Sequence, residues 1–204
     1  KNFAAYFDDK LNNKTAKLVS FTQDPISILG DSVRQILYVS PKQLNNLQAL
    51  ELLLSPKKNN YLAESLNILS LTKISKALDM VNFSFIKKLS HSADSQAQRH
   101  RMIPAIKPIF SRSINLQEPD YITPTIFRYE SAKEAKNLFD SIQEQTIKTA
   151  KFLYENNASA ESLQYILTNA YPIRYTDSAS LLDHLHKWKS RLCYNAQEEI
   201  WHCS

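Results

Sequence analysis

Glycine is almost absent from this chain of 204 residues, in which Gly30 is the single example. Glycine-rich phosphate-binding loops need several glycines, because their tight turns and close approach to phosphate leave no room for side chains. The sequence therefore excludes the Walker loop and the dinucleotide-binding loop. Any phosphate that this protein binds must be held by its side chains.

Cysteine is scarce too. The two cysteines are Cys193 and Cys203, and the chain has no signal-like start. We therefore expect free thiols in a reducing cytoplasm, with Cys193 as a small buried apolar residue. Neither cysteine lies in a recognisable arrangement of nucleophile and general base. No spacing typical of metal ligands appears, so we expect no bound metal.

Long apolar runs are missing as well. The run from Leu47 to Leu54 is interrupted by polar residues and is too short to cross a bilayer. We therefore expect a soluble, cytoplasmic protein without a membrane partner. The length suits one domain with a substantial core over residues 1–204. Because the first residue is Lys1 rather than Met, we expect a piece excised from a longer polypeptide.

The charge balance is moderately basic. The chain has 25 Lys and Arg residues against 20 Asp and Glu residues, giving a formal net charge of +5. The two signs are mixed along the chain, so the balance suits an anionic small ligand as well as nucleic acid. No groove-reading motif accompanies the basic residues. We therefore expect a small anionic partner rather than nucleic acid.

Apolar periodicity and capping residues predict a helix-rich α+β fold. Alternating apolar residues predict strands over residues 16–21, 81–86 and 171–175. Three prolines make the stretch from 104 to 119 an irregular connector. Helical periodicity and caps predict helices over residues 25–38, 41–55, 92–101, 131–156 and 159–168, two closing helices within 180–201, and one or two more within 61–77.

Two segments carry cationic side chains that are suited to a common site. Gln96 stands three residues before Arg99-His100-Arg101, and Arg191 opens the segment Arg-Leu-Cys-Tyr-Asn-Ala-Gln-Glu-Glu-Ile. The helix predicted over residues 92–101 places Gln96 and Arg99 on neighbouring ridges. Guanidinium groups are permanently charged, fork-shaped donors that match phosphate, so the arginines together would bind an anionic nucleotide. The alternative is that the Arg-His-Arg cluster is a solvated helix end.

The glutamine followed by Arg-His-Arg resembles the signature of the flavin-dependent thymidylate synthase family, ThyX. The resemblance extends, in the same order, over residues 17–25, 33–38, 83–85 and 191–200. It implies a helix-rich fold with a small, mainly antiparallel sheet, in a homo-oligomer. It also implies reductive methylation of deoxyuridine monophosphate (dUMP) to thymidylate, with FAD as cofactor and NADPH and methylenetetrahydrofolate as co-substrates.

The resemblance also implies roles for individual residues. It assigns dUMP binding to Gln96, Arg99 and Arg191. Arg191 would be the catalytic residue, since a fixed cation beside the pyrimidine favours ionisation of the ring nitrogen. The same resemblance assigns FAD binding to Arg99, His100, Arg101 and His186. For His186, an ordinary, partly buried histidine is the alternative interpretation.

The chain departs from the family in the loop after Arg-His-Arg. Where the family has a glutamate, a serine and an arginine, this chain has Lys107, Ile109 and Ser111. Gln164 stands at a further arginine of the family, and residues 180–182 stand at its Asn-x-Arg segment. We therefore expect one half of a tandem, whose site a second ThyX-like domain completes. The alternative is a pseudoenzyme half with a structural or oligomerisation role.

A third group of polar residues stands apart from these motifs. Arg174 lies between Tyr171 and Tyr175, and aromatic residues interleaved with arginine can stack on a nucleic-acid base. The alternative is that the tyrosines fasten a strand to a helix.

Overall fold

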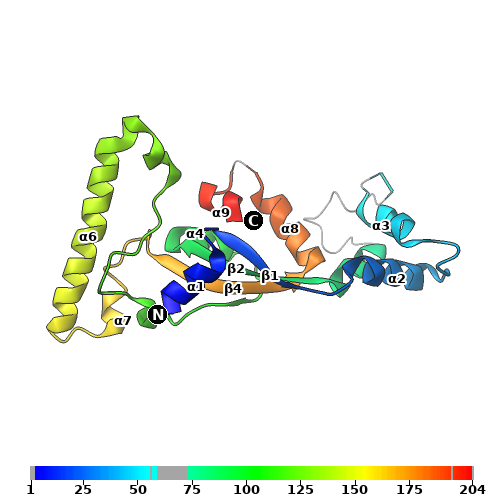
Figure 1. The fold of residues 1–204 in the computed structure, drawn as a ribbon, viewed down its shortest axis with the longest axis horizontal. Helices are drawn as coiled ribbons and strands as arrows, with labels where there is room; N and C mark the ends of the chain where they lie inside the picture. Colours follow the sequence, from blue (N-terminus) through cyan, green and yellow to red (C-terminus); the bar gives the residue numbers. More distant parts are fainter. Residues whose placement is uncertain (1–2, 56, 59–72, 194, 204) are drawn as a thin grey trace.

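The computed structural model describes residues 3–55, 57–58, 73–193 and 195–203, and it confirms the α+β fold class (Figure 1). Four antiparallel strands form one sheet in the order β1-β2-β4-β3. The elements in chain order are α1 (Phe3–Leu11), β1 (Ala16–Phe21), α2 (Pro25–Leu37), α3 (Asn46–Leu54), the 3-10 helix η2 (Ile74–Met80), β2 (Asn82–Ser90), α4 (His91–Ala97), β3 (Ala105–Ile106), α5 (Phe110–Ser113), the 3-10 helices η3 (Thr125–Arg128) and η4 (Glu130–Ala132), α6 (Lys133–Glu155), α7 (Ala160–Leu163), β4 (Pro172–Ser180), α8 (Leu181–Arg191) and α9 (Glu198–Cys203).

The molecule is elongated, with α2 and α3 at one end, α6 at the other and the sheet between them (Figure 1). Strands β2 and β4 pair along their whole length, from Asn82 opposite Ser180 to Ser90 opposite Pro172. Because residues directly opposite each other share a face, this register sorts the side chains into two sets. One face packs against α4, α8 and α9, and the other receives α1.

The α2–α3 end has its own apolar core. Leu29, Val33 and Leu53 are buried there together with residues of η2 and with Val81, which precedes β2. Helix α2 begins at Pro25, as predicted, and the Asp24 side chain accepts a hydrogen bond from the Ser27 N–H. The single glycine lies where α3 approaches α2, since a Cβ on Gly30 would lie 2.6 Å from Asn46 Oδ1.

The helix predicted over residues 41–55 is wrong in its start and right only in part in its buried face. Helix α3 begins at Asn46, because Asn45 and Gln48 form a capping box there. The side chains buried by α3 are those of Ala49 and Leu53, while Leu47 is 76% exposed. Of the leucines predicted to share the apolar side, Leu44 and Leu50 pack against the core, whereas Leu47 and Leu54 are exposed.

The prediction of a helix through Arg101 is also wrong. Helix α4 ends at Ala97, and residues 98–102 form turns that lead to β3. The N–H groups of Arg99 and His100 bond to carbonyls three residues back, which is turn geometry and not α-helix. Arg99 and Gln96 consequently do not share a helix.

Several other helices and strands differ from the prediction in where they begin or end. Strands β2 and β4 both run beyond their predicted ends, and α7 is a single turn rather than a helix to residue 168. Strand β1 has the predicted range but no buried face, because its side chains are partly or fully exposed. The helices predicted within 61–77 lie mostly outside the described residues, and η2 begins at Ile74. Helix α1 was not predicted.

No helix within the described ranges is long and apolar enough to span a bilayer.

Candidate functional site

The two cationic segments of the sequence meet in the fold. Arg191, the last residue of α8, donates a hydrogen bond from Nε to Nε2 of His100 at 2.6 Å. Nearby in the chain, the Gln197 N–H donates to Gln96 Oε1 at 3.1 Å. Residues about ninety to a hundred positions apart are thus in direct contact. The structure brings Gln96, His100 and Arg191 into one region, on the side of the sheet that α4 and α8 cover.

Helix α9 fixes this arrangement from the C-terminal side. The Glu199 carboxylate accepts hydrogen bonds from the backbone N–H and the hydroxyl of Ser90, the residue that caps α4. Ile200 is fully buried against Leu89 and Ala93. A charge-assisted contact and an apolar contact therefore hold α9 over the start of α4. This packing keeps Gln197 beside Gln96.

The remaining predicted residues lie around this contact. The rings of His100 and His186 have their centroids 6.1 Å apart in an edge-on arrangement. Arg99 and Arg101 lie on the turn after α4 and are exposed. Their guanidinium groups make no hydrogen bond or ion pair with other described residues, so the structure does not join them to Arg191.

The electrostatics of the site are dominated by cations. Burial, followed by the charges of Arg191, Lys187 and His186, lowers the pKa of His100 from 6.5 to about 4. His100 is therefore neutral at neutral pH. Within the described part of the chain, no carboxylate forms an ion pair with Arg191. The charge of this arginine is therefore uncompensated by the residues that the structure describes.

A buried charge cluster lies under α8, and the sequence analysis missed it. Lys87 and Lys187 both contact Asp177 Oδ2, at 2.8 and 3.0 Å, and all three side chains are almost fully buried. Burial raises the pKa of Asp177, but the two lysines outweigh it and lower that pKa. Burial and the neighbouring Lys87 lower the pKa of Lys187 to about 8. One sequence pattern could have revealed this cluster. Residues two apart in a strand share a face, so the alternation of Phe83, Phe85, Lys87 and Leu89 places Lys87 on the buried face.

The loop that contains Lys107, Ile109 and Ser111 is held in place by an ion pair within the chain. Lys107 pairs with the buried Asp94 of α4 at 2.6 Å, and its Nζ lies 5.4 Å from the centre of the Tyr175 ring. The Gln98 side chain donates a second hydrogen bond to Asp94. At the position where the resemblance implies an acid, this chain thus has a lysine that neutralises the Asp94 carboxylate of α4. Ile109 is exposed.

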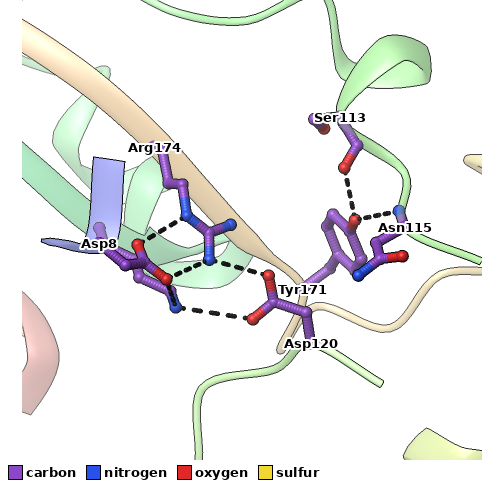
Figure 2. Close-up of polar contacts among 7 residues, drawn as sticks. Asp8, Ser113, Asn115, Asp120, Tyr171 and Arg174 are labelled. Atoms are coloured by element: carbon purple, nitrogen blue, oxygen red, sulfur yellow. Dashed lines mark hydrogen bonds and ion pairs between the residues drawn. The ribbon is translucent and has the colours of Figure 1, made fainter. Parts of the chain in front are cut away.

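The Tyr171–Arg174–Tyr175 group is structural, and Figure 2 shows the contacts of Tyr171 and Arg174. Arg174 binds both carboxylate oxygens of Asp8, at 2.8 and 2.7 Å, and also pairs with Asp120 at 2.9 Å. Tyr171 and Tyr175 are both buried. The guanidinium and the rings are therefore engaged within the fold, which supports the structural interpretation over base stacking.

The cysteines differ from the expectation in one respect. Both are free thiols, as predicted, but Cys193 is exposed and Cys203 is buried. Cys193 was expected in the core; instead it follows the end of α8, where the chain leaves the packed layer. Burial raises the pKa of the Cys203 thiol, which disfavours the thiolate. Across the described residues, no group of three His, Cys, Asp or Glu side chains is arranged to hold a metal ion.

The donor set suits a phosphate-bearing ligand. Two exposed guanidinium groups and one half-buried guanidinium lie on neighbouring segments, without carboxylate partners among the described residues. Guanidinium groups bind phosphate through paired N–H donors. The half-buried rings of His100 and His186 add flat surface beside them. These residues fit an anionic nucleotide and a dinucleotide cofactor with a flat ring system.

Comparison with known proteins identifies the family of this chain. A family model described as thymidylate synthase complementing protein matches residues 17–203. A search of curated proteins gives no match. Because the family model covers nearly the whole chain and both cationic segments, the chain belongs to the thymidylate synthase complementing protein family, ThyX.

Proposed function

We propose that this chain is a domain of a flavin-dependent thymidylate synthase and supplies Gln96, Arg99 and Arg191 to a shared dUMP site. Family membership supports flavin-dependent thymidylate synthase function in broad terms. The observation that carries the finer proposal is the 2.6 Å contact between His100 and Arg191, which joins the two cationic segments. Their arginines lack carboxylate partners among the described residues, so their charge is available to an anion.

Arg191 is the residue that we propose acts on the pyrimidine. Reaction at the uracil ring requires negative charge to develop on it, and a fixed guanidinium stabilises that charge. The neutral His100 orients Arg191 without cancelling its charge. The buried Cys203, whose thiol pKa is raised, is not suited to attack the ring, and the thiol of the exposed Cys193 donates to the Ser190 carbonyl rather than to a general base. In this proposal the chain therefore contributes charge and orientation rather than a nucleophile.

Gln96 and Arg99 would hold the nucleotide. Gln96 uses its side-chain oxygen to accept from the Gln197 N–H, which leaves the two N–H groups of its amide as donors for a ligand. Those donors match a phosphate or carbonyl oxygen. Arg99 adds an exposed permanent charge on the adjacent turn.

The same region would hold part of FAD. Arg99, His100, Arg101 and His186 are the residues that we propose face the cofactor, with cations toward its phosphates and imidazoles toward its rings. FAD supplies the redox chemistry when bound, with NADPH as reductant and methylenetetrahydrofolate as one-carbon donor. This chain's residues would bind and orient these molecules.

We further propose that a second ThyX-like domain, the other half of a tandem, completes the site, and that the tandem polypeptide forms a homo-oligomer. The loop that carries the family's glutamate, serine and arginine has Lys107, Ile109 and Ser111 here. Lys107 is also drawn back onto Asp94. The missing donors must therefore come from another copy that has kept them.

A pseudoenzyme half is the second candidate, and the Lys107–Asp94 pair favours it, because that pair only stabilises the chain itself. Substitution in the full-length protein separates the two. Loss of a charge-assisted contact costs about 1.5 to 3 kcal/mol, so Arg191→Met should weaken dUMP binding by about 10- to 150-fold in a calorimetric titration. Arg112→Met, which removes an exposed arginine elsewhere, is the matched control. If both variants bind dUMP like the parent protein, the arginines are structural.

A further inference from the structure

The hydrogen bond between Arg191 and His100 fixes the chemical state of the histidine. Arginine Nε can only donate, so His100 Nε2 must accept, at 2.6 Å. An imidazole that accepts at Nε2 is neutral and carries its proton on Nδ1. The hydrogen bond therefore requires His100 to be neutral, with its proton on Nδ1.

The surroundings of His100 maintain that state. The charged and titratable groups that face it, Arg191, Lys187 and His186, all come from α8, and together with burial they disfavour a proton on the ring. No carboxylate within the described residues forms an ion pair with His100 or Arg191. A histidine surrounded by cations remains an acceptor for the arginine over the physiological pH range.

A neutral acceptor affects arginine differently from a carboxylate. A carboxylate at this place would orient Arg191 but would also compensate its charge, leaving less attraction for an anionic ligand. His100 engages Nε and fixes the plane of the guanidinium, while no described residue pairs with its charge or bonds to the four N–H groups of its two terminal nitrogens. The hydrogen bond already restricts the long arginine side chain before a ligand binds. Binding therefore costs less side-chain conformational entropy.

We propose that His100 is a positioning residue that presents Arg191 to the bound pyrimidine nucleotide. This inference rests on the proposed function, in which Arg191 contacts dUMP. It predicts that the acceptor atom of residue 100, rather than its ring or its charge, determines the affinity.

The direct test is nuclear magnetic resonance on the full chain labelled with nitrogen-15, without nucleotide. His100 Nε2 should be the unprotonated nitrogen between pH 5 and pH 8, coupled through the hydrogen bond to the Nε–H of Arg191. A protonated Nε2, or an Arg191 Nε–H that exchanges as fast as that of the exposed Arg112, overturns the proposal. This measurement does not depend on dUMP binding, so it decides the positioning role even if the proposed function fails.

The functional test compares two substitutions in the full-length protein. His100→Leu keeps the bulk but removes the acceptor, and we expect dUMP affinity to fall roughly tenfold. His100→Gln offers an amide oxygen to Arg191 and should restore most of that loss. His202→Leu, at an exposed histidine of α9, is the matched control and should change nothing.

A double-mutant cycle completes the test. In an Arg191→Met background, His100→Leu should cause no further loss, because it acts through Arg191. Full additivity of the two losses, or equal losses for His100→Leu and His100→Gln, contradicts the positioning role while leaving the proposed function intact. Absence of dUMP binding in the parent protein contradicts the proposed function instead.

Discussion

Two arginines, Arg174 within β4 and Arg191 at the end of α8, have opposite surroundings. Arg174 lies among Asp8, Lys88 and Asp120, where two carboxylates balance two bases (Figure 2). Arg191 has a neutral histidine as its hydrogen-bond partner and no ion pair in the described part of the chain. The partner of an arginine, rather than its burial or sequence context, therefore separates a charge that stabilises the fold from one available to a ligand.

The largest loss of stability should follow from removing a buried carboxylate that pairs with cations inside the fold. Asp177→Leu would leave Lys87 and Lys187 buried without their shared partner, and breaking such a cluster costs about 3 to 5 kcal/mol. Urea denaturation should show this loss. Glu144→Leu, which removes an exposed and distant partner of Lys148, is the control and should change stability by less than about 0.5 kcal/mol. Equal midpoints for the two variants would contradict the role given to Asp177.

Substitution of the two arginines should give opposite results. Arg174→Met should lower the free energy of unfolding by about 2 to 3 kcal/mol, because it removes the two-pronged contact with Asp8 and the ion pair with Asp120, and leaves Lys88 as the one cation paired with both carboxylates among the described residues. Arg191→Met should lower stability by no more than about 1 kcal/mol, because it removes one hydrogen bond to a half-buried neutral histidine. Affinity for dUMP should follow the reverse order. If Arg191→Met destabilises the protein as much as Arg174→Met does, the distinction between the two arginines is lost.

A smaller change tests the hydrogen bonds beside Arg174. The Tyr171 hydroxyl donates to the Ser113 carbonyl at 2.7 Å and accepts from the Asn115 N–H at 2.9 Å (Figure 2). Tyr171→Phe should therefore cost about 1 kcal/mol, visible as a lower thermal midpoint. Tyr165→Phe, at a largely exposed tyrosine, should leave the midpoint unchanged. An unchanged midpoint for Tyr171→Phe as well would show that these bonds add nothing to stability.

The most gradual effect is that of pH. The pKa of His100 lies near 4 in the folded chain, below its ordinary value of 6.5, so the unfolded chain binds more protons between these values. Stability should therefore fall as pH decreases through that window. The pKa values of Asp8 and Asp177 are lowered from 3.8, so their contribution is present above pH 3.8 and is lost as pH falls further. His100→Gln should flatten the decline above pH 4, and an unchanged slope would contradict the assignment.

Much of the fold could be predicted from local sequence patterns, and the wrong predictions of helix boundaries also have local causes. Alternation identified β1 and the start of β2, and the Asp24–Pro25 cap identified the start of α2. The start of α3 was missed because the capping box at Asn45 outweighs the proline at 41. The end of α4 was missed because no glycine or proline marks it.

The candidate site was predictable only in part. The motif order indicated that Gln96 and Arg191 belong to one region, but not that His100 rather than Arg99 would contact Arg191. That contact depends on the turn after Ala97, which brings the histidine toward α8. Sequence alone could not separate Arg174 from Arg191 either, since Asp8 and Asp120 reach Arg174 from distant segments.

The division of the dUMP site between two domains can be measured by mixing. The second component is a ThyX-type chain that keeps its glutamate, serine and arginine loop but whose own glutamine and late arginine are replaced by alanine. Calorimetric titration of dUMP should show weak binding to the present chain alone, tight binding to the mixture, and weak binding again when the mixture contains Arg191→Met. Tight binding to the present chain alone, or a mixture that Arg191→Met leaves unchanged, would contradict the account.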